Sequence, residues 1–406
     1  MTAIKPAMKH GRATEPAAST STRAADGSSF LSKSAFDSER AMARRLDGPP
    51  ALSMAEELRS AVGESGRGQM SLLTDIWRMA RGGGRLTPQE YMYYRLWDPA
   101  LSTEEKRQFV GKRTQTALHR ACNPPTWYTL AHDKLIFQAA ASGLGLPVPK
   151  LRAIFHPSRT AGGLVQARDG EGLKDLLQNG LSGPIFAKPI DGMYSLGTLA
   201  IERSDDGHGF VVNGAAARLD ELVDYLSFRR EQGYLFQDRV SPHPRVRAMI
   251  GDRLPTMRVL VLVDRQGRGE AVSAVVKVPA GGQTADNYWR PENLLGALEL
   301  ETGTITRAIN GWGCKLSTVE THPDTDVRLA GATLPQFDEA MALVGRAAAA
   351  FPGIRTQSWD IALSDQGPIA MELNFGGDLN LHQLAHGRGV MDARYRDHVA
   401  DCRSKP

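Results

Sequence analysis

The chain has 406 residues, of which 41% are hydrophobic and 23% charged, and its formal net charge is +4. This length supports one large domain or two to three small ones, and so small a net charge neither requires nor excludes a nucleic-acid partner. Three widely spaced cysteines argue against a disulfide framework and indicate a reducing cytoplasm; the sequence also lacks a secretory signal and an apolar run of about 18 residues that could span a membrane.

Residues 1–68 are expected to form a mostly disordered tail. The stretch 17–22 is of low complexity, and large apolar residues are scarce in this part of the chain. One helix is expected within it, around residues 53–62, with Ser53 and Glu56 as a capping box.

Residues 69–125 are expected to form a helical module. Apolar residues recur at helical spacing from Leu72 onward. Thr87 followed by Pro88 and Glu90 predicts the start of a second helix, and Ser102 predicts the start of a third.

Residues 126–395 change in character, because short β-type runs alternate with helical patterns. A helix is expected over 133–142 and further helices over 219–228 and 336–351. The expected strands cover 184–189, 198–202, 209–212, 234–240, 256–264 and 270–278. This mixture favours an α+β architecture over a doubly wound parallel sheet, followed by a C-terminal tail over 396–406.

Residues 358–374 carry the sharpest signal, two alternating segments around a turn centred on Gln366. In that register three apolar pairs meet on the core side: Trp359 with Leu373, Ile361 with Met371, and Leu363 with Ile369.

The other face of this predicted hairpin is acidic. It places Asp360 directly opposite Glu372, with Asn374 two residues further on, and like charges in that position repel each other. A divalent cation would offset the repulsion, because Mg²⁺ prefers such oxygen ligands. The alternative is that both carboxylates point into water.

A second signal is Lys188 at the end of a predicted strand, followed by a loop in which Gly192, Ser195 and Gly197 let backbone amides approach an anion. No Walker A motif is present, and an exposed lysine beside a hairpin loop is the alternative interpretation. Lys134 begins a predicted helix upstream. Arg258 and Lys277 lie in apolar strands and Asn287 in a polar loop, so that several polar groups along one sheet favour a shared anionic ligand.

The order of these motifs resembles the ATP-grasp superfamily over roughly residues 110–395. More narrowly, it resembles the sugar-transfer-associated or α-L-glutamate-ligase-related ATP-grasp group. The stretches that carry the likeness are 133–134, 145–149, Lys188 with its loop, 235–238, Arg258, 277–279, 286–290, 322–325, 358–361 and 372–374.

The resemblance implies two α+β subdomains that grip ATP. It implies that Lys134 and Lys188 contact the phosphates, that the 191–198 loop folds over them, and that Gln237 and Asp238 lie beside the adenine and ribose. It further assigns Mg²⁺ to Asp360, Glu372 and Asn374, and the transferring phosphoryl group to Arg258 with Lys277 or Asn287. One departure is Gln237, because many ATP-grasp proteins have a glutamate there; Asp238 or His243 is the substitute.

By this resemblance the chain is expected to be a cytoplasmic, Mg-ATP-dependent ligase that activates a carboxylate as an acyl phosphate for attack by an amine or a thiol. A link to polysaccharide assembly is a further implication. A phosphotransferase on the same fold and a nucleotide-binding regulatory module remain alternatives, and neither a nucleic-acid partner nor a membrane span is expected. Residues 376–383 either line the acceptor pocket or simply start a helix capped by Asp378.

Overall fold

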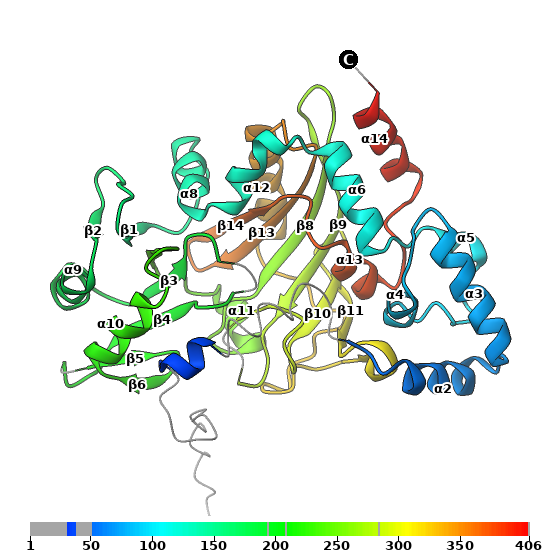
Figure 1. The fold of residues 1–406 in the computed structure, drawn as a ribbon, viewed down its shortest axis with the longest axis horizontal. Coiled ribbons are helices and arrows are strands. Elements are labelled where there is room, and N and C mark those ends of the chain that lie inside the picture. The colour runs from blue at the N-terminus through cyan, green and yellow to red at the C-terminus, as the bar shows by residue number, and fades with distance from the viewer. Residues whose placement is uncertain (1–30, 38–50, 193–194, 208, 283–284, 405–406) are drawn as a thin grey trace, which may run out of the picture.

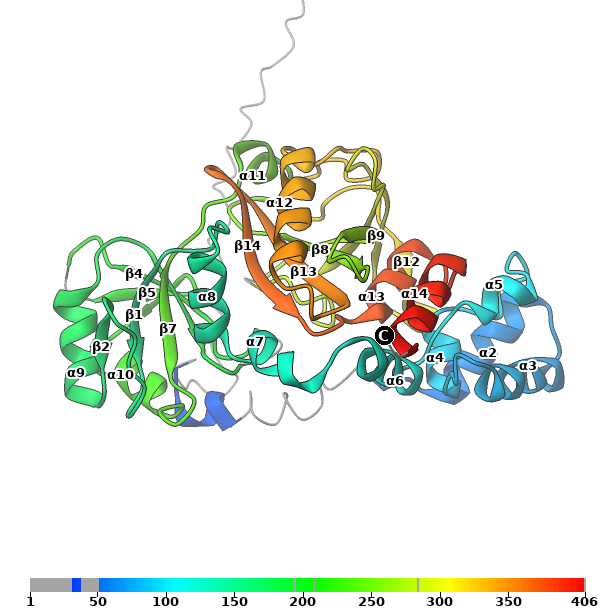
Figure 2. The ribbon, with the colours of Figure 1, turned by 90° about the horizontal axis from the view of Figure 1, so that it is seen from above.

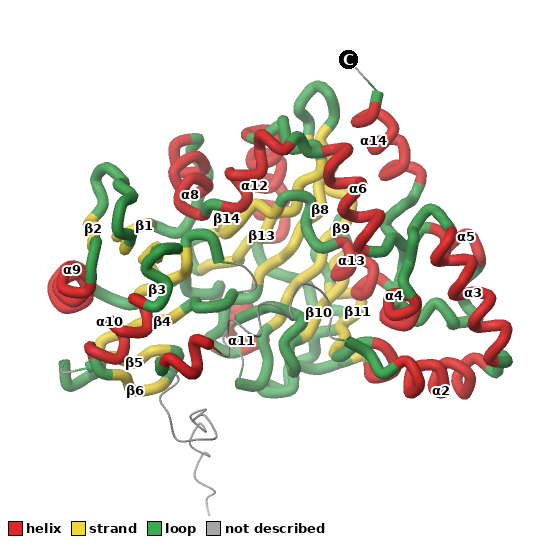
Figure 3. Tube along the Cα trace, in the orientation of Figure 1, coloured by secondary structure: helices red, strands yellow, loops and turns green. Residues whose placement is uncertain are grey.

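The computed structural model describes residues 31–37, 51–192, 195–207, 209–282 and 285–404. Two seven-stranded sheets and a group of helices follow one another along the long axis of the molecule, with the second sheet in the middle (Figure 1, Figure 2). Strands fill the left and centre of the view and helices dominate the right (Figure 3). Among the described residues, no helix is both long and apolar enough to cross a bilayer.

The first sheet lies within residues 151–238. In spatial order its strands are β2 (Val165–Ala167), β1 (Leu151–Phe155), β7 (Tyr234–Asp238), β3 (Ile185–Pro189), β4 (Leu199–Arg203), β5 (Phe210–Val212) and β6 (Ala215–Ala217). Helices α9 (Gly170–Asp175) and α10 (Leu219–Ser227) pack against it through buried leucines. The sequence predicts β3, β4, β5 and β7 and misses β1, β2 and β6.

The second sheet contains the predicted hairpin. In spatial order its strands are β12 (Ser317–Thr318), β11 (Ile305–Asn310), β10 (Leu294–Leu298), β9 (Gly269–Val278), β8 (Thr256–Val263), β13 (Thr356–Ser364) and β14 (Gly367–Asn374). All its ladders are antiparallel, and among the described strands only β1 and β2 pair in parallel. The α+β architecture expected from the sequence is confirmed.

One face of the second sheet is covered by α12 (Phe337–Ala350), the helix predicted over 336–351. Trp359 of β13 is fully buried there, between the rings of Phe351 and Phe137. Phe137 belongs to α8 (Lys134–Gly143), so the same core also fixes the helix that carries Lys134. Because Trp359 packs on this face, the neighbouring side chains of β13 lie on the opposite face of the sheet. That face is directed towards the first sheet.

The N-terminal helices share a core with the second sheet. They are α2 (Met54–Ser65), α3 (Gln69–Arg81), α4 (Pro88–Tyr93), α5 (Thr103–Arg107) and α6 (Lys112–Cys122). Tyr91 and Trp97 pack in one cluster with Leu295 of β10 and with Leu381 of α13 (Leu379–His386). The helical module is thus held against the sheet by apolar contacts and does not stand apart from it.

Of the two predicted capping boxes, the one at Thr87 is confirmed, and the helix start predicted at Ser102 also forms one. Thr87 and Ser102 each accept a hydrogen bond from the amide three residues on, while the glutamate there bonds back. The box predicted at Ser53 is wrong, because its side chain makes no capping bond. The neighbouring Glu57 is instead buried and accepts a hydrogen bond from the amide of Cys314, which holds the start of α2 by tertiary contact.

The two expected tails differ in outcome. Much of the 1–68 segment lies outside the described residues, and the helix expected around 53–62 is α2. Residues 396–406, expected as a tail, instead include most of α14 (Ala393–Arg403), which packs on α6. This helix escapes prediction because only Tyr395 and Val399 are buried on an otherwise polar sequence.

Candidate functional site

A cavity of about 930 Å³ lies between the two sheets, within the usual size range of ligand pockets. Ten of the predicted site residues line it: Lys134, Lys188, Gly192, Ser195, Arg258, Lys277, Asn287, Asp360, Glu372 and Asn374. Three others, Gly197, Gln237 and Asp238, do not line it. The tertiary structure thus gathers groups from distant parts of the sequence into one site.

Lys188 is the most unusual cation of the cavity. It lies on β3 with a relative exposure of 7%, and its ammonium group has no hydrogen bond or ion pair with any described residue. Burial, together with the nearby charge of Lys134, lowers its pKa to about 8, while Glu372 across the cavity opposes the shift. A buried ammonium without a counter-ion is unfavourable, so the position indicates that an anionic ligand completes it.

Lys134 stands at the first position of α8, where Asp133 caps the helix by accepting hydrogen bonds from Leu135 and Ile136. Its ammonium group donates to the carbonyl oxygen of Gly192, at the start of the glycine loop. The loop and both lysines therefore meet at one end of the cavity. The loop residues 193–194 lie outside the described part of the chain.

Gly197 acts through its backbone. Its φ of +73° is left-handed, and a Cβ atom there would lie 2.8 Å from the Arg229 guanidinium carbon. A glycine is needed for the path of this loop, although the residue does not line the cavity.

The hairpin of β13 and β14 forms with the predicted register only at its open end. Trp359 pairs with Leu373 and Asp360 pairs with Glu372, as predicted. The pairs predicted nearer the turn are wrong, because a β-bulge after Asp360 brings Ile361 opposite Ala370. The extra residue of a bulge has no partner, and here it lets Met371 line the cavity beside Glu372.

Asp360 is neutralised by cations of the same sheet. Arg258 on β8 donates from Nε and Nη2 to the two carboxylate oxygens, each at 2.8 Å, and Lys277 on β9 donates at 2.9 Å. Lys277 also lies 3.4 Å from Asp286. The repulsion expected between Asp360 and Glu372 is therefore offset by Arg258 and Lys277 within the protein itself, before any metal is considered.

The pKa values reflect this network. Burial by itself would raise the pKa of Asp360, but Arg258 and Lys277 together hold it well below its usual range. Burial likewise opposes the charged guanidinium of Arg258, yet Asp360 raises its pKa further above the usual value. Both groups therefore stay charged at neutral pH, whereas Glu372 forms no ion pair with any described residue.

Several buried polar atoms around the cavity lack a hydrogen-bond partner among the described residues. They include Nδ2 of Asn287, Nδ2 of Asn374 and Oε1 of Gln115, all on residues that line the cavity. Such atoms are rare in folded proteins unless a ligand or water satisfies them. Together with Lys188 they indicate a polar, anionic ligand.

At the end of the cavity nearest β7, the lining residues are not the ones that the sequence predicts. Gln237 is buried and donates to Gln138, and Asp238 forms an ion pair with Arg152. His243 caps α11 (Pro244–Ile250) and does not line the cavity either. Residues 239–242, directly after Asp238, line the cavity in place of Gln237, Asp238 and His243.

Sequence reasoning missed two further groups of lining residues. Phe186 lies two positions before Lys188 on β3, so the period-2 alternation of the strand could have found it. Lys112 and Gln115 come from α6 in the N-terminal module, and Gln115 donates to the carbonyl oxygen of Gly377. No local pattern marks these two, because only the packing of α6 on the second sheet brings them to the cavity.

The motif at 322–325 has a supporting position. His322 is fully buried, with Nε2 3.0 Å from the carbonyl oxygen of Pro279. Asp324 accepts hydrogen bonds from the amide of Gly281 and from Arg253. These contacts hold the loop that follows Lys277.

Comparison with known proteins adds one family match. The family described as sugar-transfer associated ATP-grasp matches residues 113–397. The resemblance inferred from the motifs is thereby confirmed. No curated protein matches the chain.

Solved structures with a similar chain path include three enzymes. An L-amino acid ligase from Bacillus licheniformis is 16% identical, with a TM-score of 0.38, over 71% of this chain and 54% of that one. A D-alanine–D-alanine ligase from Bacillus anthracis is 13% identical, with a TM-score of 0.37, over 71% and 74%. An ADP complex of N5-carboxyaminoimidazole ribonucleotide synthetase is 13% identical, with a TM-score of 0.37, over 67% and 53%.

Proposed function

Because the chain belongs to the sugar-transfer associated ATP-grasp family, we propose that it is a Mg-ATP-dependent ligase that activates a carboxylate as an acyl phosphate for attack by an amine or a thiol. The observation that carries the proposal is Lys188, a buried cation that faces the cavity without a partner among the described residues. A triphosphate supplies the charge that such a group lacks, through charge-assisted hydrogen bonds.

The residues at the cavity fit a nucleotide with its metal. Glu372 presents carboxylate oxygens that form no ion pair among the described residues, and Asn374 presents an amide oxygen. Asp360 Oδ1 accepts a hydrogen bond from Arg258 alone, so it keeps a lone pair for a third metal bond. Oxygen donors of this kind suit Mg²⁺. We assign the metal to these three residues and the phosphates to Lys134, Lys188 and the backbone around Gly192 and Ser195.

When bound, Mg-ATP supplies the phosphoryl group that activates the carboxylate. The protein contributes position and charge, which are the main needs of phosphoryl transfer. Two hydrogen bonds to Asp360 fix the plane of the Arg258 guanidinium. In that position the guanidinium would neutralise negative charge on the phosphoryl group being transferred. Lys277 and Asn287 assist from the same wall of the cavity.

The adenine and ribose are assigned to the end lined by Phe186 and the 239–242 segment. Gln237 and Asp238 support that segment from β7 and are not direct contacts in this proposal. The acceptor is assigned to the opposite end, where Lys112 and Gln115 of α6 face Gly377 and Asp378. Asp378 also caps α13, so both interpretations of the 376–383 segment apply to it.

The acceptor end is polar and carries both a positive and a negative side chain. Such charges suit a carboxylate or an amine substrate. A substrate attached to a glycan is consistent with the sugar-transfer association of the family. Use of ATP and the presence of free thiols among the described cysteines both suit a cytoplasmic reaction.

The test is turnover with Mg-ATP and a panel of carboxylates in the presence of hydroxylamine, which traps an acyl phosphate as a hydroxamate. We expect ADP and hydroxamate in equal amounts with an active carboxylate. A stable phosphorylated alcohol would instead identify a phosphotransferase, and ATP binding without turnover on any acceptor would identify a regulatory module.

The metal assignment is tested by Glu372→Gln. Because Glu372 makes no ion pair among the described residues, the variant should fold normally but lose at least about a hundredfold in ADP formation. Glu320→Gln is the matched control, since that side chain is exposed and outside the cavity. Wild-type rates in Glu372→Gln would rule out the assigned metal site.

A further inference from the structure

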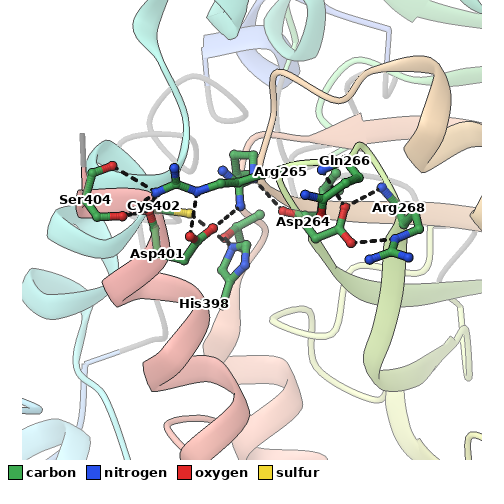
Figure 4. Close-up of polar contacts among 11 residues, drawn as sticks. Asp264, Arg265, Gln266, Arg268, His398, Asp401, Cys402 and Ser404 are labelled. Carbon is green, nitrogen blue, oxygen red and sulfur yellow. Dashed lines mark hydrogen bonds and ion pairs between the residues drawn. The ribbon is translucent and has the colours of Figure 1, made fainter. Parts of the chain in front are cut away.

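Three metal-ligand side chains gather outside the cavity, near the start of β13. Cys122 ends α6, and His398 and Cys402 lie on α14. One ligand atom from each lies within 4.8 Å of the other two. None of the three lines the cavity, so the proposed ligase chemistry leaves them without a role. Figure 4 shows His398 and Cys402 on α14, beside Arg265 and Asp401.

The distance between two of these atoms fits a tetrahedral ion. Cys402 Sγ lies 3.4 Å from His398 Nε2. Zinc bonds to sulfur and to imidazole nitrogen would put the two atoms about 3.6 Å apart, and two sulfurs about 3.8 Å apart. A disulfide needs sulfur atoms only about 2 Å apart, and both cysteines are free in the structure. His398 and Cys402 are four residues apart, so both point from one face of α14.

The surroundings of the three side chains leave access for an ion and hold the histidine ring. Cys122 is buried, whereas His398 and Cys402 are half-buried, so an ion can enter from the surface. The ring of Tyr395 contacts that of His398 edge-on and limits its rotation. Asp401 is not a ligand candidate, because its two oxygens accept hydrogen bonds from Arg265 and Arg355.

The chemistry of the donors selects the ion. Two thiolates and an imidazole suit Zn²⁺ and do not suit Mg²⁺. Two thiol protons leave to solvent on binding, so that the bound site carries no net charge. The hydroxyl of Thr356 on β13, 3.3 Å from His398 Nε2, can hydrogen-bond a water at the fourth position.

We propose that Cys122, His398 and Cys402 form a zinc site that fastens the C-terminal helix α14 to α6, beside the start of β13 in the second sheet. Because α6 also carries Lys112 and Gln115 into the cavity, the ion would hold the helix that shapes the acceptor end. The site is separate from the Mg-ATP site, and each can be tested without the other.

The experiment uses the full-length chain, purified without chelator and under reducing conditions. Zinc content is measured by elemental analysis, and Co²⁺ is titrated into the metal-free protein. We expect one Zn²⁺ per chain and a thiolate-to-cobalt charge-transfer band in the near ultraviolet. Cys402→Ser and His398→Ala should each weaken Zn²⁺ binding by at least about a hundredfold, with circular dichroism as the folding check.

Cys314→Ser is the matched control, because Cys314 is the remaining cysteine and lies apart from the cluster. It should retain the full zinc content and the cobalt band. Absence of the cobalt band in the wild-type chain would overturn the proposal even if a variant fails to fold. So would zinc that Cys402→Ser keeps, or a Cys122–Cys402 disulfide found by mass spectrometry of the unreduced protein.

Discussion

At the residue scale, Lys188 is a residue of the candidate site that destabilises the folded state. Its ammonium group is buried on β3 beside Lys134, with no bonded partner among the described residues. Burial of an unpaired charge destabilises the folded state and at the same time prepares it for an anion. Asp360 is the contrasting case, because Arg258 and Lys277 neutralise its charge.

Replacing Lys188 by methionine should therefore stabilise the protein while weakening ATP binding. A pKa lowered to about 8 corresponds to about 3 kcal/mol of destabilisation at pH 7, which the variant removes. Loss of a charge-assisted contact should weaken ATP binding at least about tenfold. Urea unfolding and calorimetric titration measure the two effects.

Lys174→Met is the control for this substitution, because Lys174 is an exposed lysine with a distant ion pair. Its free energy of unfolding should stay within about 0.5 kcal/mol of wild type. A Lys188→Met protein that is less stable than wild type would show that Lys188 has a stabilising partner.

The same pKa predicts a pH dependence. Lys188 is protonated below about pH 8 and loses its charge above it, so kcat/KM for ATP should fall as pH rises through 8. The unfolded chain still holds this proton up to about pH 10.4, so the lysine's destabilising effect should fade between pH 8 and 10. In Lys188→Arg, which stays charged, the decline near pH 8 should vanish; its persistence would assign the titration to another group.

At the scale of elements, the hairpin and the end of α6 show two ways in which the second sheet positions the site. The bulge after Asp360 keeps Asp360 opposite Glu372 while it shifts the turn end of β14 by one residue. Asn123, directly after α6, is buried and bonds both the carbonyl oxygen and the amide of Thr356, at 2.9 and 2.8 Å. These two bonds tie the helix to the start of β13.

Asn123→Ala should lower the free energy of unfolding by about 2–4 kcal/mol, because it leaves two buried backbone groups of Thr356 without partners. Chemical denaturation measures the change. Asn179→Ala is the control, since its side chain is exposed and bonds only to Asp175 among the described residues. A loss below about 1 kcal/mol for Asn123→Ala would mean that water replaces both bonds.

At the scale of the whole molecule, the cavity is lined by three parts of the chain. Lys188 and the glycine loop belong to the first sheet, Arg258 and Glu372 to the second, and Lys112 to the N-terminal helices. A ligand in the cavity bridges all of them. Its binding should therefore stabilise the molecule as a unit.

Mg-ATP at about a hundred times its dissociation constant should stabilise the wild-type chain by about 2.7 kcal/mol, seen as a rise in melting temperature. Leaving out Mg²⁺, without adding a chelator, should remove much of this gain. Glu372→Gln should respond to ATP alike with and without Mg²⁺, whereas Glu320→Gln should behave as wild type. A magnesium-dependent shift retained in Glu372→Gln would place the metal elsewhere.

The sequence by itself determined the local features of this protein. Alternation at period two predicts β3, β8, β9 and the hairpin, and the Thr87 and Ser102 boxes mark helix starts, because backbone and side-chain geometry act over a few residues. It also indicated Lys188, Asp360 and Glu372 as residues of one site, and the motif order identified the family.

Only the tertiary structure decided which charges meet. Arg258 and Lys277 neutralise Asp360 because β8 lies between β9 and β13, an order of strands that no local pattern encodes. The same holds for Gln115 in the cavity and for Cys122 beside His398 and Cys402, whose helices are brought together by packing. Apolar burial depends on the whole chain, so distant pairings of this kind lie beyond what spacing along the sequence can specify.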